Sequence, residues 1–288
     1  MLDAHTLLVL ARYPSLEQTY EVETRYRAVV RTYAISNQKG GVGKTTTAIN
    51  LAAGLAGIGF RVLLIDTDPQ ANATTSLGYR GATDGGTTYD LLLDGPADLQ
   101  VIATSVPGLS LLPSSPDLAG AEIELVGVEG RERRLRDGVA TLGSGSDVVL
   151  IDCPPSLGLL TLNALVAAQG AIVPIQCEYL ALEGLSQLLR TIQLVRQGLN
   201  TELSITGVLM TMFDRRTNLA AQVVAEVQQH FQREIFQTII PRSVRLGEAP
   251  SHGMSIFTYD PTSSGALAYR ALAVEFVARE GLASGTAV

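Results

Sequence analysis

With 288 residues and 46% hydrophobic side chains, the chain is long enough to bury a large core and is typical of a globular protein. Its net charge of −7 argues against a surface that binds nucleic acid all over, so any such contact must come from a local patch. No apolar stretch approaches the roughly 18 residues that cross a bilayer, and the two cysteines are too few for a disulfide scaffold and fit a reducing cytosol.

Residues 1–31 are polar, mix arginines with acids, and precede the first strand-like run. The short apolar run 6–11 lacks a basic region before it and is interrupted by Arg12, so we predict no signal peptide. Two interpretations remain open. The segment is a short extension, helical or disordered, or it results from an upstream start codon with the true start near Val29 or Val30. We prefer the second, because the fold that follows is complete without it.

Strands and helices then alternate along the chain. The predicted strands are 33–36, 61–66, 109–112, 147–152, 171–176, 203–212 and 238–240, and the predicted helices are 44–56, 157–168, 181–199, 219–231 and 263–279. Continuous apolar runs such as 61–66 are typical of strands that are covered on both faces. We therefore predict an α/β fold, a doubly wound, mostly parallel sheet with helices on both faces, in one domain over 32–280 and with a frayed tail at 281–288.

A glycine-rich loop lies between the first predicted strand and the first predicted helix. It comprises Lys39, Gly40, Gly41, Val42, Gly43, Lys44, Thr45 and Thr46. Glycines allow successive backbone N–H groups to turn toward a phosphate, and the helix N-terminus adds partial positive charge. We expect Lys44 to bridge the β- and γ-phosphates of ATP and Thr45 to bind Mg²⁺. The alternative, a glycine-rich turn with incidental lysines, does not explain the flanking strand and helix.

The two lysines of this loop deviate from the usual phosphate-loop pattern and from the rest of the chain. Gln38 stands where the pattern GxxxxGK[ST] has its first glycine, and Lys39 opens the motif instead. Of the 21 basic residues only Lys39 and Lys44 are lysines. A compact ammonium enters a phosphate cradle where a planar guanidinium does not fit, so both lysines are predicted to contact phosphate.

Carboxylates end two of the apolar strands. Asp152 closes the strand 147–152, while Asp66 and Asp68 follow the strand 61–66. Ligands bind at the carboxyl ends of strands in such sheets. We predict that Asp152 orients Mg²⁺, and that one of Asp66 and Asp68 positions the attacking water while the other helps to hold the metal. The alternative for the pair is that each aspartate caps a turn.

Five ordered motifs carry a family resemblance: KGGVGKTT, VLLIDTDPQANAT, VVLIDCPPSLGLLTLNAL, FDRRTNL and IIPRSVRLGEAPSHG. They resemble the ParA/Soj ATPases that partition bacterial chromosomes and plasmids, over about residues 33–279. The resemblance implies an ATP-sandwich homodimer that binds Mg-ATP and double-stranded DNA without sequence preference. It also implies slow ATP hydrolysis that a ParB-type partner stimulates, and a cytoplasmic protein associated with the nucleoid.

The resemblance also implies roles for single residues. Lys39 resembles the lysine that reaches across the dimer to the partner's phosphates. Lys44, Thr45 and Thr46 resemble the phosphate and Mg²⁺ ligands within one subunit. Asp68 resembles the residue that activates water, with Asp66 beside it and Asp152 as the Walker B carboxylate.

Three further positions follow from the last two motifs. Pro241 and Arg242 resemble the segment that lies along the adenine, and Arg216 and Arg245 resemble basic residues of the DNA-binding face. Arginines outnumber acids between 215 and 245, which suits contacts to phosphates without base reading. The alternative is a solvated face with scattered arginines.

Chemistry favours a dimeric switch independently. A phosphate loop with no arginine finger nearby is expected to hydrolyse ATP slowly, because phosphoryl transfer depends on charge around the γ-phosphate. A lysine delivered by a second subunit would couple the nucleotide state to association.

Two other functions compete with this one. A MinD-like membrane ATPase uses a basic amphipathic C-terminal helix, whereas the tail 280–288 contains no lysine, arginine or aromatic residue, so we expect no membrane contact. A metabolic ligase with the same loop needs a second substrate pocket, for which no motif is present. Cys153 and Cys177 each lack a nearby second cysteine, so we predict no iron–sulfur cluster.

Overall fold

The computed structural model describes residues 30–80, 85–178 and 183–283, and its helices and strands all belong to the unit Arg31–Val288. Residues 1–29 of the predicted extension, the first two residues of the helix predicted at 181–199, and residues 284–288 of the predicted tail lie outside the described residues.

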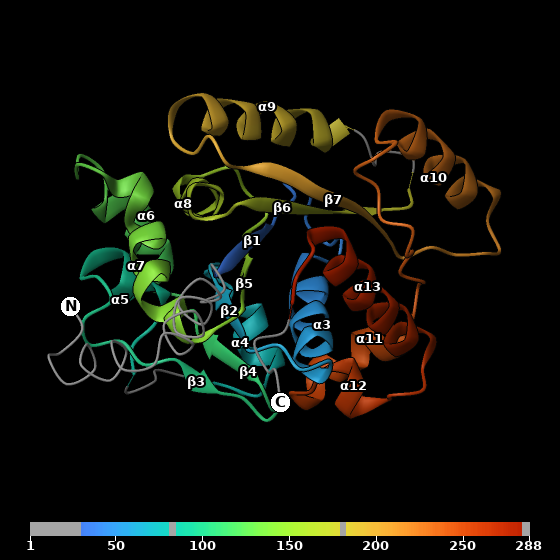
Figure 1. The fold of residues 1–288 in the computed structure, drawn as a ribbon, viewed down its shortest axis with the longest axis horizontal. Helices are drawn as coiled ribbons and strands as arrows, with labels where there is room; N and C mark the ends of the chain where they lie inside the picture. The colour runs from blue at the N-terminus through green and yellow to red at the C-terminus, as the bar shows by residue number, and fades with distance from the viewer. Residues whose placement is uncertain (1–29, 81–84, 179–182, 284–288) are drawn as a thin grey trace, which may run out of the picture. The chain divides into compact units, whose positions relative to one another are not determined.

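A seven-stranded sheet forms the centre of the unit, in the order β3-β4-β2-β5-β1-β6-β7 (Figure 1). Every neighbouring pair is parallel except β3 with β4. The strands are β1 Arg31–Ile35, β2 Val62–Asp66, β3 Ile102–Ala103, β4 Leu109–Leu112, β5 Val148–Asp152, β6 Gly170–Gln176 and β7 Ser204–Thr211. The predicted mostly parallel sheet is confirmed.

Helices cover both faces of this sheet (Figure 1). The helices are α3 Lys44–Gly57, α4 Asn72–Ser76, α5 Thr88–Leu93, α6 Leu118–Glu124, α7 Arg134–Leu142, α8 Leu159–Ala167, α9 Glu183–Gly198, α10 Asn218–His230, α11 Val244–Glu248, α12 Ile256–Tyr259 and α13 Ser264–Glu280, with short 3-10 turns η1 Arg131–Arg133, η2 Gly143–Gly145 and η3 Ala249–His252. In Figure 1, α8 and α9 lie on one side of the sheet, and α3 and α13 lie on the other. No helix among the described residues is long and apolar enough to cross a membrane.

Side-chain alternation explains why both faces are covered. Tyr33 and Ile35 of β1 point into the core beneath α3 and α13, as do Leu64 of β2 and Leu150 of β5. Their neighbours in the strands are buried as well, since β2 and β5 are buried at every position. Residues that alternate along a strand face opposite sides of the sheet, so strands that are buried throughout need a helical layer on each side.

The helix that follows the glycine-rich loop is held between the sheet and α13. Most of α3 is buried, including its small residues Ala48, Ala52 and Ala53. A Cβ on Gly54 would lie 3.1 Å from the Ala273 Cβ of α13, so small residues set how closely these two helices approach.

The parallel arrangement brings the carboxyl ends of the strands to one edge. Ile35 is in register with Asp152, and Asp152 with Asp66. The strand predicted at 238–240 is wrong, because this segment makes only single bonds to the end of β7. Ile240 N donates to the Met210 carbonyl (2.9 Å), and the Ile240 carbonyl accepts from Phe213 N (3.0 Å).

Candidate nucleotide-binding site

The glycine-rich loop runs from the end of β1 to the start of α3 with an open inner surface. Gly41 (φ 73°) and Gly43 (φ 89°) adopt the left-handed conformation that favours glycine. A Cβ at Gly41 would find no atom within 4 Å, so the space beside this residue is free. Gly43 is the N-cap residue of α3, where unpaired backbone N–H groups attract anions.

Side chains from neighbouring strands fix the loop. Asn37 donates from Nδ2 to the Pro174 carbonyl of β6 (2.8 Å) and accepts from Lys39 N (3.0 Å). Thr211, at the end of β7, donates to the Val42 carbonyl (2.8 Å). Neither Asn37 nor Thr211 was predicted from the sequence, because a single polar residue at a strand end carries no signal of its partner.

The two lysines lie in different environments. Lys44 is only 6% exposed and donates from Nζ to the Lys39 carbonyl (3.2 Å). Burial lowers the pKa of Lys44, and the negative charge of Asp152 opposes this shift. Lys39 is half-buried, and among the described residues its ammonium has no hydrogen bond or ion pair. Lys44 thus uses one of the three donors of its ammonium within the loop, whereas the ammonium of Lys39 has none of its donors engaged by the described part of the chain.

The carboxylate of Asp152 is buried at the end of β5. Neither of its oxygens has a hydrogen-bond partner among the described residues. Burial raises the pKa of Asp152 well above that of an ordinary carboxyl and the charge of Asp66 adds to the rise, while the Thr45 hydroxyl and Lys44 oppose it. Buried polar atoms without a partner are rare in proteins and call for an explanation such as an ion.

Asp66, in register with Asp152, has its oxygens engaged. One oxygen accepts from the backbone N (2.9 Å) and the hydroxyl (2.7 Å) of Thr74, and the other accepts from Asp68 N (3.1 Å). Burial raises the pKa of Asp66 to about 6, although the hydrogen bonds from Thr74 lower it. Asp66 therefore holds the segment between β2 and α4 in place, and its role as a metal ligand remains a prediction.

Asp68 lies in the turn that follows. Its carboxylate accepts from Gln70 N (2.9 Å), and its carbonyl accepts from the Ser114 hydroxyl (2.7 Å). The turn continues through Ala71, whose φ of 50° is unusual for a residue other than glycine. Asp68 is almost buried at the strand edge that carries Asp152, and its role in positioning water remains a prediction.

Asp152 and Thr45 fit part of a magnesium site, in which nucleotide phosphates would supply the other ligands. Among the described residues, no group of three or more His, Cys, Asp or Glu side chains is placed to hold a metal by itself. Mg²⁺ is usually bound by one or two carboxylates together with substrate phosphates. Asp152, with two free oxygens beside the Thr45 hydroxyl, supplies such a partial site.

A cavity of about 230 Å³ adjoins the loop. Residues distant in sequence line it: Gly43, Thr46, Met212, Pro241, Arg242 and Gly247. The segment 241–242 is held there because Phe213 accepts a bond from Arg242 N (2.9 Å). The structure thus brings the predicted adenine residues Pro241 and Arg242 next to the predicted phosphate residue Thr46.

The predicted DNA-contacting arginines are exposed but paired with acids. Arg216 lies 2.6 Å from Asp214. Arg245 lies 2.9 Å from Glu248 and 3.4 Å from Asp260. A contact with DNA phosphate at either residue would compete with these carboxylates.

Both cysteines, Cys153 and Cys177, are buried free thiols.

The chain is similar to known proteins over most of its length. The family model for an AAA domain matches residues 30–205. The sporulation initiation inhibitor protein Soj of Bacillus subtilis is 55% identical over 85% of this chain and 97% of its own length, and the chromosome partitioning protein ParA of Myxococcus xanthus is 53% identical over 90% and 92%. A crystal structure named cobyrinic acid a,c-diamide synthase, from Mycobacterium smegmatis with an ATP analogue and magnesium, is 40% identical with a TM-score of 0.76, covering 90% of this chain and 100% of that chain. The chain belongs to the ParA/Soj family of chromosome-partitioning ATPases.

Proposed function

We propose that this protein is an ATP-dependent switch that segregates DNA, most directly a chromosome. In this account Mg-ATP drives sandwich dimerisation and DNA binding without sequence preference, and slow hydrolysis, stimulated by a ParB-type partner, resets the protein. The observation that carries the nucleotide part is the orphaned, buried carboxylate of Asp152 beside an open phosphate loop and an adjoining cavity.

Each part of the nucleotide has a candidate site. The phosphates meet the backbone of the glycine-rich loop, Lys44 and the N-terminus of α3. Asp152 and Thr45 would hold Mg²⁺, which neutralises charge that develops on the phosphates during transfer. The adenine lies in the cavity beside Pro241 and Arg242, and Asp68 positions the attacking water.

Dimerisation supplies what one subunit lacks. The described residues around Lys39 leave its ammonium without a partner, and the loop that bears it is open in front of Gly41. A partner subunit's nucleotide would give that ammonium a phosphate to bind. Dimer stability would then depend on the γ-phosphate, so hydrolysis would release the two subunits.

The relatives support the biological role. Proteins named Soj and ParA are more than half identical to this chain over nearly their whole length, and one of their names refers to chromosome partitioning. Three parts of the proposal rest on this relationship: binding of double-stranded DNA, a ParB-type partner and association with the nucleoid. A small-molecule amidation, suggested by the name of the Mycobacterium smegmatis structure, rests on a relative of lower identity.

Nucleotide-dependent association tests the switch. Sedimentation velocity should show a dimer with a non-hydrolysable ATP analogue and Mg²⁺, and a monomer with ADP. Lys39→Ala should bind the analogue and stay monomeric, and Lys39→Arg should behave in the same way, because a planar guanidinium does not replace a compact ammonium. Lys44→Ala is the control that should lose nucleotide binding itself. A Lys39→Ala protein that dimerises like the wild type would contradict the proposal.

A further inference from the structure

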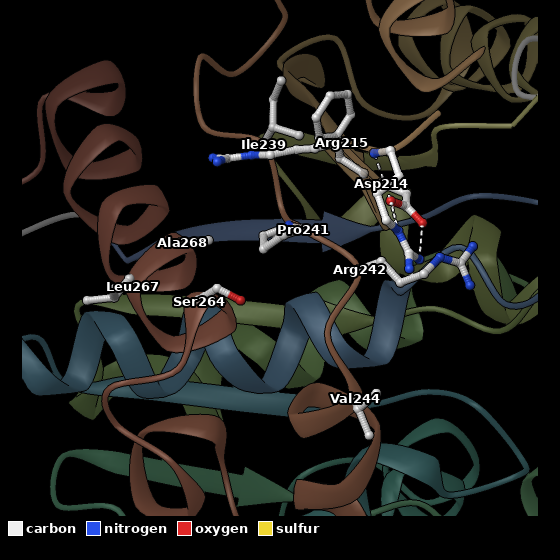
Figure 2. A pocket seen from close by; sticks show the side chains of 11 residues that line it. Asp214, Arg215, Ile239, Pro241, Arg242, Val244, Ser264, Leu267 and Ala268 are labelled. Atoms are coloured by element: carbon white, nitrogen blue, oxygen red, sulfur yellow. Dashed lines mark hydrogen bonds and ion pairs between the residues drawn. The ribbon is translucent and has the colours of Figure 1, made fainter. Parts of the chain in front are cut away.

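A basic hollow lies beside the adenine cavity. Its volume is about 770 Å³, and Arg215, Arg216 and Arg242 line it together with a single acid, Asp214. Its remaining walls are apolar or small, among them Ile239 and Leu267. Figure 2 shows Arg215 extending along this wall, away from Asp214. Three arginines over apolar walls suit the phosphate oxygens of a nucleic-acid backbone, which arginine commonly binds.

The arginines of the hollow differ in how far they are neutralised. Arg216 binds Asp214 with two parallel bonds, Nε to Oδ1 (2.9 Å) and Nη2 to Oδ2 (2.6 Å). Arg242 lies 3.4 Å from Glu178. The side chain of Arg215 is exposed and forms no hydrogen bond or ion pair within the described part of the chain. Arg215 is therefore the arginine of this hollow whose charge is exposed to solvent and is not paired with an acid among the described residues.

The pair of Arg216 with Asp214 imitates a phosphate contact. A carboxylate that accepts two parallel bonds from a guanidinium uses the same fork that binds two phosphate oxygens. Asp214 also accepts from the backbone N of Arg216 (3.0 Å), so the carboxylate is held in place. The Arg216 side chain is 85% exposed, and exposed ion pairs are weak enough for phosphate to displace.

We propose that this hollow receives the phosphate backbone of double-stranded DNA, with Arg215 as its unopposed contact and Asp214 as a built-in competitor for Arg216. The inference rests on the proposed DNA binding and adds a residue and a restraint to it. Because Asp214 must be displaced before Arg216 contacts phosphate, the acid weakens binding and keeps it reversible.

The test compares three variants with the wild type on random duplex DNA, with a non-hydrolysable ATP analogue and Mg²⁺, over a series of salt concentrations. Arg215→Ala should weaken binding about tenfold at physiological salt and lower the slope of log affinity against log salt by about one for each subunit bound. Asp214→Asn, which keeps the size of the side chain but removes its charge, should tighten binding severalfold. Arg196→Ala, an exposed arginine of α9, is the control that should change nothing.

Failure of this inference and failure of the proposed function give different results. A wild type that binds ATP but no DNA overturns both. A wild type that binds DNA, with Arg215→Ala unchanged in affinity and salt slope, overturns only the assignment of the hollow. Stronger displacement of DNA by polyglutamate than by an equal charge of heparin would show that the hollow prefers an acidic peptide, and would also overturn it. The nucleotide-induced rise in melting temperature should be equal in all variants, which shows that they are folded.

Discussion

At the scale of single residues, two aspartates in register on neighbouring strands have opposite environments. Both carboxylate oxygens of Asp66 accept hydrogen bonds, from Thr74 and from the backbone of its own turn, whereas the carboxylate oxygens of Asp152 have no hydrogen-bond partner among the described residues. The apolar runs predicted both aspartates at the strand ends. They did not predict this difference, because the partners of Asp66 lie in a turn and a short helix that have no periodicity of their own.

The first prediction concerns Asp152. Asp152→Asn should leave the melting temperature without nucleotide equal to or above that of the wild type, because the change removes a carboxylate whose ionised form is disfavoured by burial. The variant should lose the stabilisation that Mg-ATP gives to the wild type, about 2.7 kcal/mol at a hundredfold excess over Kd. Thermal unfolding with and without Mg-ATP measures both effects.

Asp137→Asn provides the matched control, since Asp137 is an exposed aspartate of α7. It should change neither the melting temperature nor the response to Mg-ATP. An Asp152→Asn protein that still hydrolyses ATP in a magnesium-dependent way would refute the assignment of this carboxylate to the metal.

At the scale of elements, α11 forms one wall of the proposed adenine cavity. Gly247 of α11 lines that cavity, and a Cβ there would find no atom within 4 Å. Gly247→Leu should therefore fold normally but fill the cavity and weaken ATP binding at least tenfold.

Competition with a fluorescent ATP analogue checks this second prediction. Pyrophosphate should compete equally well in variant and wild type, because the glycine-rich loop is untouched. If Gly247→Leu bound ATP as tightly as the wild type, the adenine would have to lie elsewhere.

The turns at Gly78 and Gly253 are in close backbone contact. A Cβ at Gly253, which ends η3, would lie 2.8 Å from the Gly78 Cα that follows α4. Helix α4 comes directly after the turn of Asp68, and η3 comes directly after α11. The segments that follow α4 and α11 thus meet at a contact that leaves no room for a Cβ on Gly253.

The third prediction uses a pair of glycines with similar backbone angles. Gly253 (φ 68°) and Gly281 (φ 61°) both adopt the left-handed conformation, but only Gly253 is in close contact. Gly281→Ala should lower the free energy of unfolding by about 1 kcal/mol, and Gly253→Ala by about 1–3 kcal/mol more. Urea unfolding of both variants compares them, and equal losses would show that the contact between the turns tolerates a side chain.

The sequence predicted the long, strongly apolar elements well and the short ones poorly. The apolar runs 61–66 and 147–152 predicted β2 and β5 correctly, because every side chain of a central strand is buried and therefore tends to be apolar. Helices α4–α6, α11 and α12 were not predicted, because segments of four to seven residues are too short to show a helical period. Helix α7 is longer and amphipathic, and it was not predicted either. The segment 238–240, wrongly predicted as a strand, packs beside the end of β7. Apolar character alone does not distinguish a segment that packs against a sheet from one that pairs with its edge strand.

At the scale of the whole molecule, the proposed nucleotide contacts lie near the carboxyl ends of the parallel strands of one sheet. The order of the strands makes this possible, since β1 lies between β5 and β6, and β5 lies between β2 and β1. The sequence predicted a ligand at the carboxyl ends of the strands of a mostly parallel sheet, but it did not predict the order of those strands. The pairing of Arg216 and Arg245 with acids was not foreseeable in detail, although Asp214 and Glu248 were visible beside them.

In the proposed function, ATP converts this protein into a form that binds DNA. The most direct measurement is binding to random duplex DNA with ATP, with ADP and without nucleotide, at low and at physiological salt. We predict binding only with ATP, a loss of affinity as salt rises, and a marked weakening in Arg245→Ala. No binding in any state while ATP is still bound, or equal binding in all three states, would contradict the account.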